Sequence, residues 1–356
     1  MQTQVPEPSS CTTPVSAALR SVRPETRRQL LAWLGAVAAL LVVMIMLGGL
    51  TRLTHSGLSI TEWKPVTGAL PPLSEHAWES EFAKYKTIPE YRIVNRGMTL
   101  GEFKGIYWWE WTHRFVGRLI GLVFIGPFLY FVLTRKIERA LVPRLALIAV
   151  LGGAQGALGW FMVMSGLTHR VDVSQYRLAA HLALAFTIFG AVMWTIYDLH
   201  AKGREPTEVT APARRLALAF LVLVAGQIVM GAFVAGLDAG FAYNTWPLMN
   251  GKVIPGGMGS IFEETTAAQF AHRMLAYAVL AAAFAVFWLA RRTASGALRS
   301  AKAVLHVTLL QVVLGIATLL TVVAVPLAAA HQLCAAAVLA VALFHLHTVT
   351  ARRAPA

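Results

Sequence analysis

Eight long apolar stretches limit what this chain can fold into. About 20 residues of helix cross a bilayer core of roughly 30 Å, and only helices or closed barrels satisfy the backbone in lipid. Continuous apolar runs of this length predict helices. We therefore predict an all-α integral membrane protein with eight transmembrane helices, at Leu30–Leu50, His113–Thr134, Leu145–Met164, Leu178–Leu199, Leu216–Gly236, Ala267–Ala290, Ala303–Val323 and Ala328–Val349.

Composition excludes the main alternatives. Hydrophobic residues make up 57% of the 356 residues and charged residues 13%, whereas a soluble domain carries roughly 25% charged residues. The net charge of +14 does not indicate nucleic-acid binding, because Lys and Arg in a membrane protein report its topology. Cys11 lies in a polar tail and Cys334 in an apolar stretch, so a disulfide framework is not expected.

Basic residues predict the orientation. The short connections on one side collect nearly all of them, while the long segment 51–112 carries as many acids as bases. The basic side is expected to be cytoplasmic. We predict an inner-membrane protein with both termini in the cytoplasm, a mitochondrial location being the less favoured alternative. The basic residues are Arg20, Arg23, Arg27, Arg28, Arg135, Lys136, Arg139, Arg144, Lys202, Arg204, Arg214, Arg215, Arg291, Arg292, Arg299, Lys302, Arg352 and Arg353.

The chain also repeats itself. GGLTRLTHSGLSITEW from Gly48 matches GAFVAGLDAGFAYNTW from Gly231, and EWTHR from Glu110 matches QFAHR from Gln269. RLAAHLALA from Arg177 matches LAAAHQLCA from Leu327, and Gln155-Gly156 echoes Gln311 and Gly315 more loosely. The eight helices thus form two repeated four-helix bundles, with a predicted pseudo-twofold axis along the membrane normal.

This repeat defines the expected organisation. The N-terminal repeat covers 30–200 and includes a long outer loop at 51–112, and the C-terminal repeat covers 216–350. The remaining segments are a disordered cytoplasmic tail at 1–29, a cytoplasmic linker at 201–215 and a short cytoplasmic tail at 351–356.

Four histidines occupy matching places in the repeats. His113, His181, His272 and His331 start the even-numbered spans, near the periplasmic face. A single intramembrane histidine is often only a hydrogen bond between helices, but two equivalent pairs favour haem held by two imidazoles. A zinc site would need more nearby Cys, Asp or Glu.

Neighbouring residues add to each pair. Arg114 and Arg273 follow a histidine and are candidate partners for haem propionates, with snorkelling to the interface as the alternative. Glu110 precedes His113 by three residues, on the same helix face, whereas Gln269 precedes His272. An acid near the start of a helix can also serve only to complement the helix dipole. Because the acid titrates and the amide does not, we assign chemistry to the N-terminal half and a permanent haem to the C-terminal half.

The motifs GGLTRLTHSGLSITEWKPVTGALPP, WWEWTHRFVGR and AGLDAGFAYNTWPLMNG resemble the haem A synthase family, of the alphaproteobacterial and mitochondrial subtype. The resemblance runs from Leu47 onward. Some members carry a cysteine pair in the outer loops, which this chain lacks, so no role of that pair carries over.

The resemblance implies an oxidoreductase that converts the C8 methyl group of haem O to the formyl group of haem A, through an alcohol. It implies Glu110 as the essential carboxylate, His113 and His181 as the substrate-haem pair, and His272 and His331 as axial ligands of a haem b cofactor. It also implies haem O synthase, a farnesyltransferase, and cytochrome oxidase assembly factors as partners. The electron acceptor is not identified by the sequence, and a homo-oligomer is compatible with it.

Two other classes of function are alternatives. A dihaem cytochrome passing electrons from quinol would use both histidine pairs without needing Glu110, and the Glu110/Gln269 difference favours the enzyme. A transporter has support only from the repeat, because mid-bilayer charges and broken helices are lacking. The other histidines are weaker candidates for ligands: His306, His345 and His347 at the inner face, and His55, His76, His169 and His200 in loops.

Overall fold

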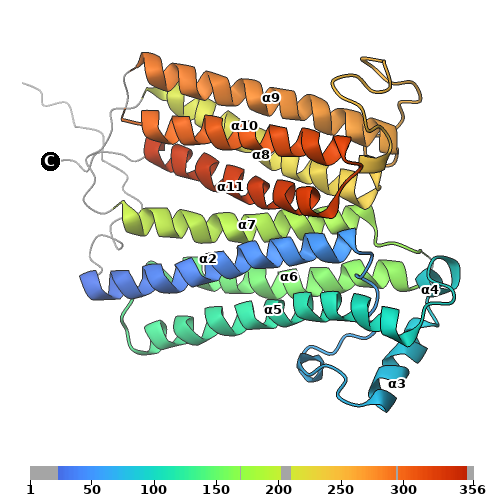
Figure 1. Cartoon of the computed structure of the whole chain (residues 1–356). Coiled ribbons are helices and arrows are strands. Elements are labelled where there is room, and N and C mark those ends of the chain that lie inside the picture. The colour runs from blue at the N-terminus through green and yellow to red at the C-terminus, as the bar shows by residue number, and fades with distance from the viewer. Residues whose placement is uncertain (1–22, 169, 202–209, 294–295, 351–356) are drawn as a thin grey trace, which may run out of the picture.

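The computed structural model describes residues 23–168, 170–201, 210–293 and 296–350. The part described is all-helical and contains eight helices long and apolar enough to cross a membrane, as predicted. They lie side by side (Figure 1). These helices are α2 (Pro24–Leu53), α5 (Leu100–Leu133), α6 (Val142–Thr168), α7 (Gln175–His200), α8 (Ala211–Gly236), α9 (Thr265–Arg292), α10 (Leu298–Leu320) and α11 (Val325–Thr350).

Each half of the chain packs in the same cyclic order. Helix α2 packs on α5, α5 on α6, α6 on α7 and α7 on α2; likewise α8 packs on α9, α9 on α10, α10 on α11 and α11 on α8. The halves meet through contacts of α2 and α7 with α8 and α11, and α7 and α11 lie next to each other in the middle of the view in Figure 1. Each half is therefore a four-helix unit whose first and last helices touch the other half.

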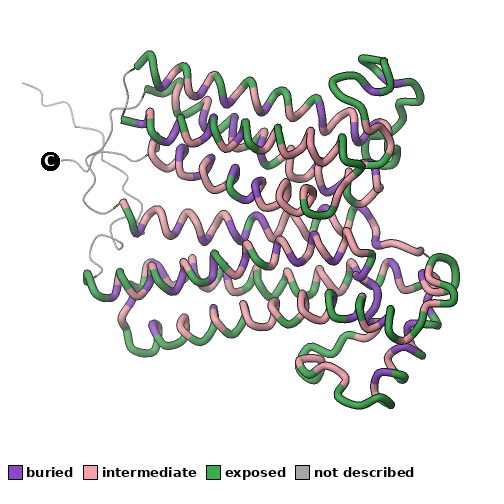
Figure 2. The backbone as a smooth tube through the Cα atoms, viewed as in Figure 1, coloured by how far each residue is buried: buried purple, intermediate pink, exposed green. Residues whose placement is uncertain are grey.

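The core runs between these central helices. Leu34, Val37, Val192 and Phe220 are essentially inaccessible and belong to one cluster shared by both halves. The opposite helix faces expose large apolar side chains, as at Leu122. Figure 2 shows buried residues along the inner sides of the helices and exposed residues on the outer sides. Such apolar outer faces suit a lipid environment.

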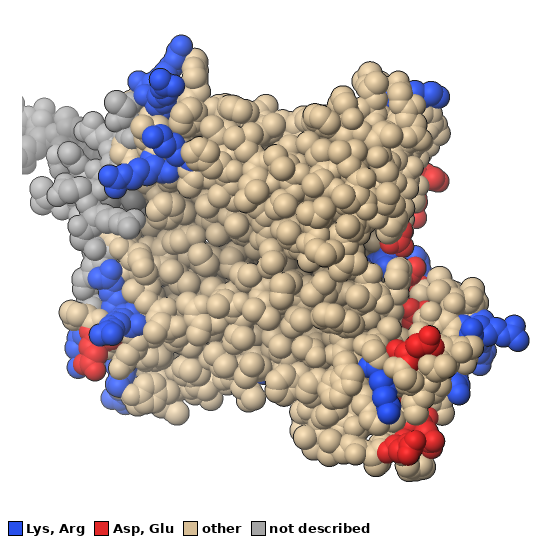
Figure 3. All heavy atoms as spheres, viewed as in Figure 1, with Lys and Arg blue, Asp and Glu red and all other residues tan. Residues whose placement is uncertain are grey.

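Charge follows the same division. On the face shown in Figure 3, Lys, Arg, Asp and Glu gather at the two ends of the helices, and the middle of the molecule shows none. An uncharged central band is what a protein crossing a bilayer requires, because a charge at the bilayer centre is costly.

Several predicted boundaries are wrong. Helix α5 begins at Leu100, well before His113, because Thr99 and Glu102 form a capping box that starts it within the predicted loop. Helix α2 begins at Pro24, inside the predicted 1–29 tail, since proline is favoured in the first helical turn. Helix α8 likewise begins inside the predicted 201–215 linker. Residues 1–22, with Cys11, and 351–356 lie outside the described residues.

The seventh span also ends earlier than predicted. Helix α10 stops at Leu320 rather than Val323, because Val322 and Val323 have φ values of 53° and 59°. A right-handed helix cannot continue through left-handed residues, and this conformation is rare for β-branched side chains. A Cβ atom built on Gly240 would lie 2.9 Å from Cγ2 of Val323, so a glycine makes room for this turn.

The predicted long loop contains a folded segment, residues 54–99, which we call the cap. It holds η1 (Thr67–Ala69), α3 (Glu75–Tyr85) and α4 (Pro89–Ile93). Trp78, Phe82 and Tyr85 form an apolar core with Phe103 of α5. The corresponding segment of the second half, 237–264, contains only the short η2 (Ala239–Phe241). The two halves thus differ most beyond the ends of their helices (Figure 1).

Candidate functional site

The four predicted histidines come from α5, α7, α9 and α11. Within each unit the two helices that carry a histidine pair are diagonal. In the cyclic order α6 lies between α5 and α7, and α10 lies between α9 and α11. His113 lies close enough to His181 to interact electrostatically, and His272 to His331. The structure therefore brings both pairs together across the interior of a four-helix unit.

A glycine of the preceding helix faces each histidine. A Cβ atom built on Gly159 would lie 2.9 Å from Cε1 of His181, and one on Gly315 would lie 2.9 Å from Cε1 of His331. The Cβ positions of Gly48 and Gly231 are 3.2 Å from ring atoms of His113 and His272. Each imidazole thus lies where the side chain of any residue larger than glycine would stand on the facing helix.

Glutamines one turn before these glycines contact three of the histidines. The amide nitrogen of Gln155 lies 3.3 Å from Nε2 of His181, and that of Gln227 lies 3.2 Å from both ring nitrogens of His272. Gln311 lies 3.5 Å from Nε2 of His331. Gln155 and Gln311 thus make similar contacts, and the glycine that faces the same histidine as Gln155 is Gly159 and not Gly156.

The chemistry of this donor set fits haem iron. The Nδ1 atoms of His181 and His331 are buried and have no hydrogen-bond partner in the structure. The same holds for the Oε1 atoms of Gln155, Gln227 and Gln311. Buried polar atoms without partners are rare, and a ring nitrogen of this kind is free to bind a metal. No group of three or more His, Cys, Asp or Glu suited to a metal occurs among the described residues, so paired imidazoles on haem fit better than zinc.

Glu110 is buried and fully engaged by the start of the cap. It is 2% exposed. Its Oε2 accepts hydrogen bonds from the Ser59 hydroxyl at 2.7 Å and the Ile60 backbone N–H at 2.8 Å. Its Oε1 accepts from Nε and Nη2 of Arg114 at 3.0 and 2.6 Å. The carboxylate is therefore held in one position, three residues before His113.

Gln269 occupies the matching place in the second half and is 3% exposed. Its amide nitrogen donates to the Tyr243 carbonyl at 3.1 Å, and its oxygen lies 3.5 Å from Nη2 of Arg273. Tyr243 matches Ile60 at the offset that relates Gly48 to Gly231. At matching positions Glu110 thus accepts a hydrogen bond from a backbone N–H, whereas Gln269 donates one to a backbone carbonyl.

The two arginines make the same pair of backbone contacts. Arg114 donates to the carbonyls of Ile60 and Glu62 at 2.8 and 3.0 Å, and Arg273 donates to those of Tyr243 and Thr245 at 2.9 Å each. With Glu110 included, four of the five N–H groups of Arg114 are occupied. A propionate would therefore have one N–H of Arg114 at its disposal. The sequence missed this bracing role, although the Glu110–Arg114 spacing of four predicts an ion pair.

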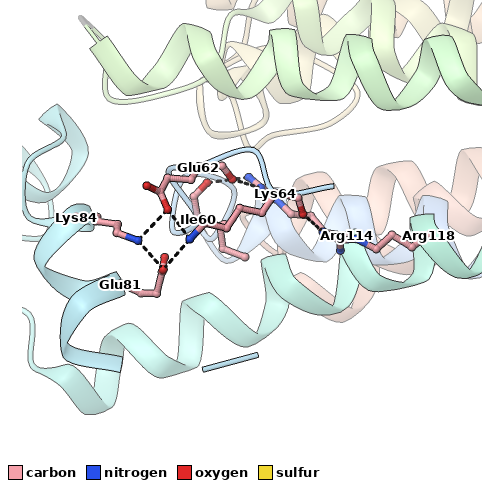
Figure 4. Close-up of polar contacts among 7 residues, drawn as sticks. All are labelled: Ile60, Glu62, Lys64, Glu81, Lys84, Arg114 and Arg118. Carbon is pink, nitrogen blue, oxygen red and sulfur yellow. Dashed lines mark hydrogen bonds and ion pairs between the residues drawn. The ribbon is translucent and has the colours of Figure 1, made fainter. Parts of the chain in front are cut away.

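A cavity of about 400 Å³ lies between the cap and α5. Its charged lining is largely paired, because Lys84 lies 2.8 Å from both Glu62 and Glu81, and Lys64 lies 2.6 Å from Glu62 (Figure 4). Hydrogen bonds from the two lysines hold the pKa of Glu62 below its ordinary value. This network ties the cap to itself, and it contains neither histidine pair.

The histidines at the other end of the helices have structural partners. Nδ1 of His345 lies 2.9 Å from the Ser300 hydroxyl, and Nε2 of His347 lies 2.9 Å from Asp198. His306 is exposed. These contacts favour a packing role over haem ligation, and His169 lies outside the described residues.

Comparisons with known proteins agree with the motifs. The model of a family described as "Cytochrome oxidase assembly protein" matches residues 31–343. A relative from Parvibaculum lavamentivorans, named "Heme A synthase", is 56% identical over 322 residues, which cover 88% of this chain and 92% of the relative. A relative with the same name from Rhodospirillum centenum is 52% identical, over 84% of this chain and 83% of the relative. Another from Azorhizobium caulinodans is 50% identical, over 91% of this chain and 95% of the relative. The chain therefore belongs to the cytochrome oxidase assembly protein family, together with these bacterial relatives named haem A synthase.

Proposed function

We propose that this membrane protein is an oxidoreductase that converts haem O to haem A for cytochrome oxidase, by oxidising the C8 methyl group to a formyl group through a hydroxymethyl intermediate. The observation that carries the proposal is the placement of a fixed, buried Glu110 beside one of two histidine pairs, in a chain at least 50% identical to relatives named haem A synthase.

We assign the substrate to the N-terminal unit. His113 and His181 would hold haem O through its iron, since they come from diagonal helices and Glu110 lies on the His113 helix face. In this arrangement the pair fixes the substrate, and the four-helix unit keeps it away from water. Holding the reacting group in one orientation is itself a large part of catalysis.

Glu110 is the residue that handles protons in this proposal. In this proposal water supplies the oxygen atom, so forming the alcohol from the methyl group releases two protons and two electrons, and oxidising the alcohol to the formyl group releases two more of each. The electrons leave the substrate for a separate electron acceptor, and a base must accept protons at the substrate carbon. Ser59, Ile60 and Arg114 fix the carboxylate in place, so its position does not depend on the substrate. Gln269 cannot take this role, because an amide does not titrate in the physiological range.

The C-terminal unit is proposed to hold a resident haem b through His272 and His331. Both rings face a glycine and contact a glutamine, and this half offers no carboxylate beside its pair. When bound, haem b supplies one-electron redox chemistry. The residues of this half position it, and they take no part in the proton transfers.

Membrane orientation and partners belong to the same proposal. Both termini are placed in the cytoplasm and the haem sites toward the periplasm, with haem O synthase as the source of substrate. Reporter fusions at Lys202 and Arg292 should report a cytoplasmic location, and fusions at Glu79 and Lys252 a periplasmic one. A reversed result at either pair would contradict this orientation.

The decisive experiment is haem extraction from cells that express the full chain with a supply of haem O. Haem A should accumulate, and a matched strain lacking the chain should contain only haem O and haem b. Two permanently bound b-type haems with no haem A would instead identify an electron-transfer cytochrome.

A further inference from the structure

The residue at one helical position distinguishes the surroundings of His113 from those of the other three histidines. Glutamine stands four residues before the facing glycine at positions 155, 227 and 311, but the residue four before Gly48 is Met44. Four residues make about one helical turn, so these side chains share a face with the glycine. We propose that Met44 leaves His113 the most weakly held of the four iron ligands, so that substrate enters and product leaves by opening the iron bond to His113.

Two of the three glutamines contact their histidines at both the backbone and the ring, whereas Gln311 contacts only the ring of His331. Gln155 donates to the backbone carbonyl of His181 at 3.1 Å and lies against its ring, and Gln227 does the same to His272 at 3.1 Å. An amide fixed to the backbone beside the ring restrains rotation of the imidazole. Polar partners of this kind orient metal ligands and typically contribute 10–100-fold in metal affinity.

Met44 cannot do this, because a thioether has no N–H to donate. Its Cε lies 3.3 Å from the Cβ position of Gly117, one turn after His113. The residue one turn after each of the other histidines is alanine, at positions 185, 276 and 335. Among the described residues no hydrogen bond of the His113 ring is found, and the ring lies beside Gly48.

This difference matches what the two units must do in the proposed function, on which the inference rests. A resident haem stays bound, whereas a substrate haem must be exchanged in every catalytic cycle. Exchange needs an iron–nitrogen bond that opens, with its electron pair remaining on the imidazole and no change of oxidation state. The structure assigns that bond to His113, because His181 retains its contact with Gln155.

The test compares haem release from purified full-length variants. Haem bound by the protein is transferred to an excess of apomyoglobin, and the release of haem O or haem A and of haem b is followed separately. Met44→Gln supplies the missing amide at nearly constant side-chain length. It should slow release of haem O and haem A about 10-fold and leave haem b release unchanged.

Two further variants complete the design. Gln227→Met makes the opposite change at the C-terminal site and should speed haem b release about 10-fold. Met46→Gln puts the same amide two residues away on another face of α2, and should leave both rates as in the unmodified chain. If Met44→Gln fails to fold, Gln227→Met tests the same contact from the other direction.

Equal release of haem O and haem A from Met44→Gln and the unmodified chain would overturn the inference, as would unchanged haem b release from Gln227→Met. Neither result would affect the proposed function, because both haems would still be bound. An unmodified chain that takes up no haem O would refute the proposed function itself.

Discussion

The two halves of the molecule build nearly the same frame around different side chains. Arg114 and Arg273 donate to backbone carbonyls at matching positions, Ile60 and Glu62 in one half and Tyr243 and Thr245 in the other. Beside this frame the N-terminal half has an acid and the C-terminal half an amide. One arginine thus braces a carboxylate, and the other braces a neutral group.

This comparison shows that the frame and the chemistry are separable. Both arginines tie a loop to the helix that carries a histidine, and this bracing does not require the acid. Glu110 is the difference that adds a carboxylate, to which we assign the proton transfers. The Met44 position and the folded cap are two further differences, and all three lie in the half to which we assign the substrate.

The largest effect is expected from Glu110→Gln, which copies the second half into the first. The substitution deletes the titrating group while keeping its size, so haem A production should fall at least ~10²-fold, the usual scale of a general acid or base. Haem extraction from membranes measures it, and haem O or its alcohol should accumulate. Gln269→Glu is the matched control and should not create a second active site. Near-normal haem A from Glu110→Gln would remove the acid from the mechanism.

His272→Ala should separate the two units next. Loss of an axial ligand should weaken haem b binding by about 10-fold or more, since even a supporting partner of a metal ligand contributes that much. The low-spin haem b spectrum of the purified protein should be lost or perturbed, while haem O uptake by the other unit persists. An unchanged spectrum in both His272→Ala and His331→Ala would show that this pair does not bind haem b.

The cap should make the N-terminal half sensitive to pH. Burial raises the pKa of Glu90 to about 8, and the Tyr85 hydroxyl donates to it at 3.1 Å. Between pH 4.5, the ordinary pKa of a glutamate, and about pH 8, Glu90 keeps its proton in the folded cap and loses it in the unfolded cap. The free energy of unfolding of the cap should therefore fall as pH rises, by up to about 1.4 kcal/mol per pH unit, and become constant above pH 8.

Limited proteolysis of the cap at pH 5.5 and pH 8 would measure this loss. Glu90→Gln should remove the pH dependence, because the amide carries no proton to release in this range. Cleavage of segment 237–264 is the internal control, since no buried acid is found in it. A cap that becomes more resistant to protease as pH rises would contradict the assignment.

The smallest effect compares two glycines of α6. A Cβ atom on Gly159 would lie 2.9 Å from the His181 ring, whereas nothing lies within 4 Å of one on Gly156. Gly159→Ala should weaken substrate-haem binding by about 1 kcal/mol, or roughly fivefold, as at the low end for an overfilled interior. Gly156→Ala should leave binding unchanged. Equal effects of the two substitutions would show that the glycine contact is unimportant.

The sequence determined the membrane architecture by itself. Eight apolar runs were enough, because the length needed to cross a bilayer and the need to satisfy the backbone in lipid are both local requirements. The histidine pairs and the Glu110/Gln269 difference were also visible, since the two halves can be compared letter by letter. The start of α5 was predicted wrongly. The capping box at Thr99 and Glu102 is a local signal, but Glu102, Lys104 and Glu110 interrupt the apolar run, so a search for continuous apolar residues begins only near His113.

Only the tertiary structure decided how those residues are held. The contacts of Glu110 with Ser59 and Ile60 join residues about 50 positions apart, and no periodicity in the chain specifies them. The same holds for the glutamines that lie on the histidines, because the contact depends on how two helices are rotated against each other. Sequence spacing places side chains on a face of one helix. Which atoms meet across the bundle is fixed by the packing of all the helices together.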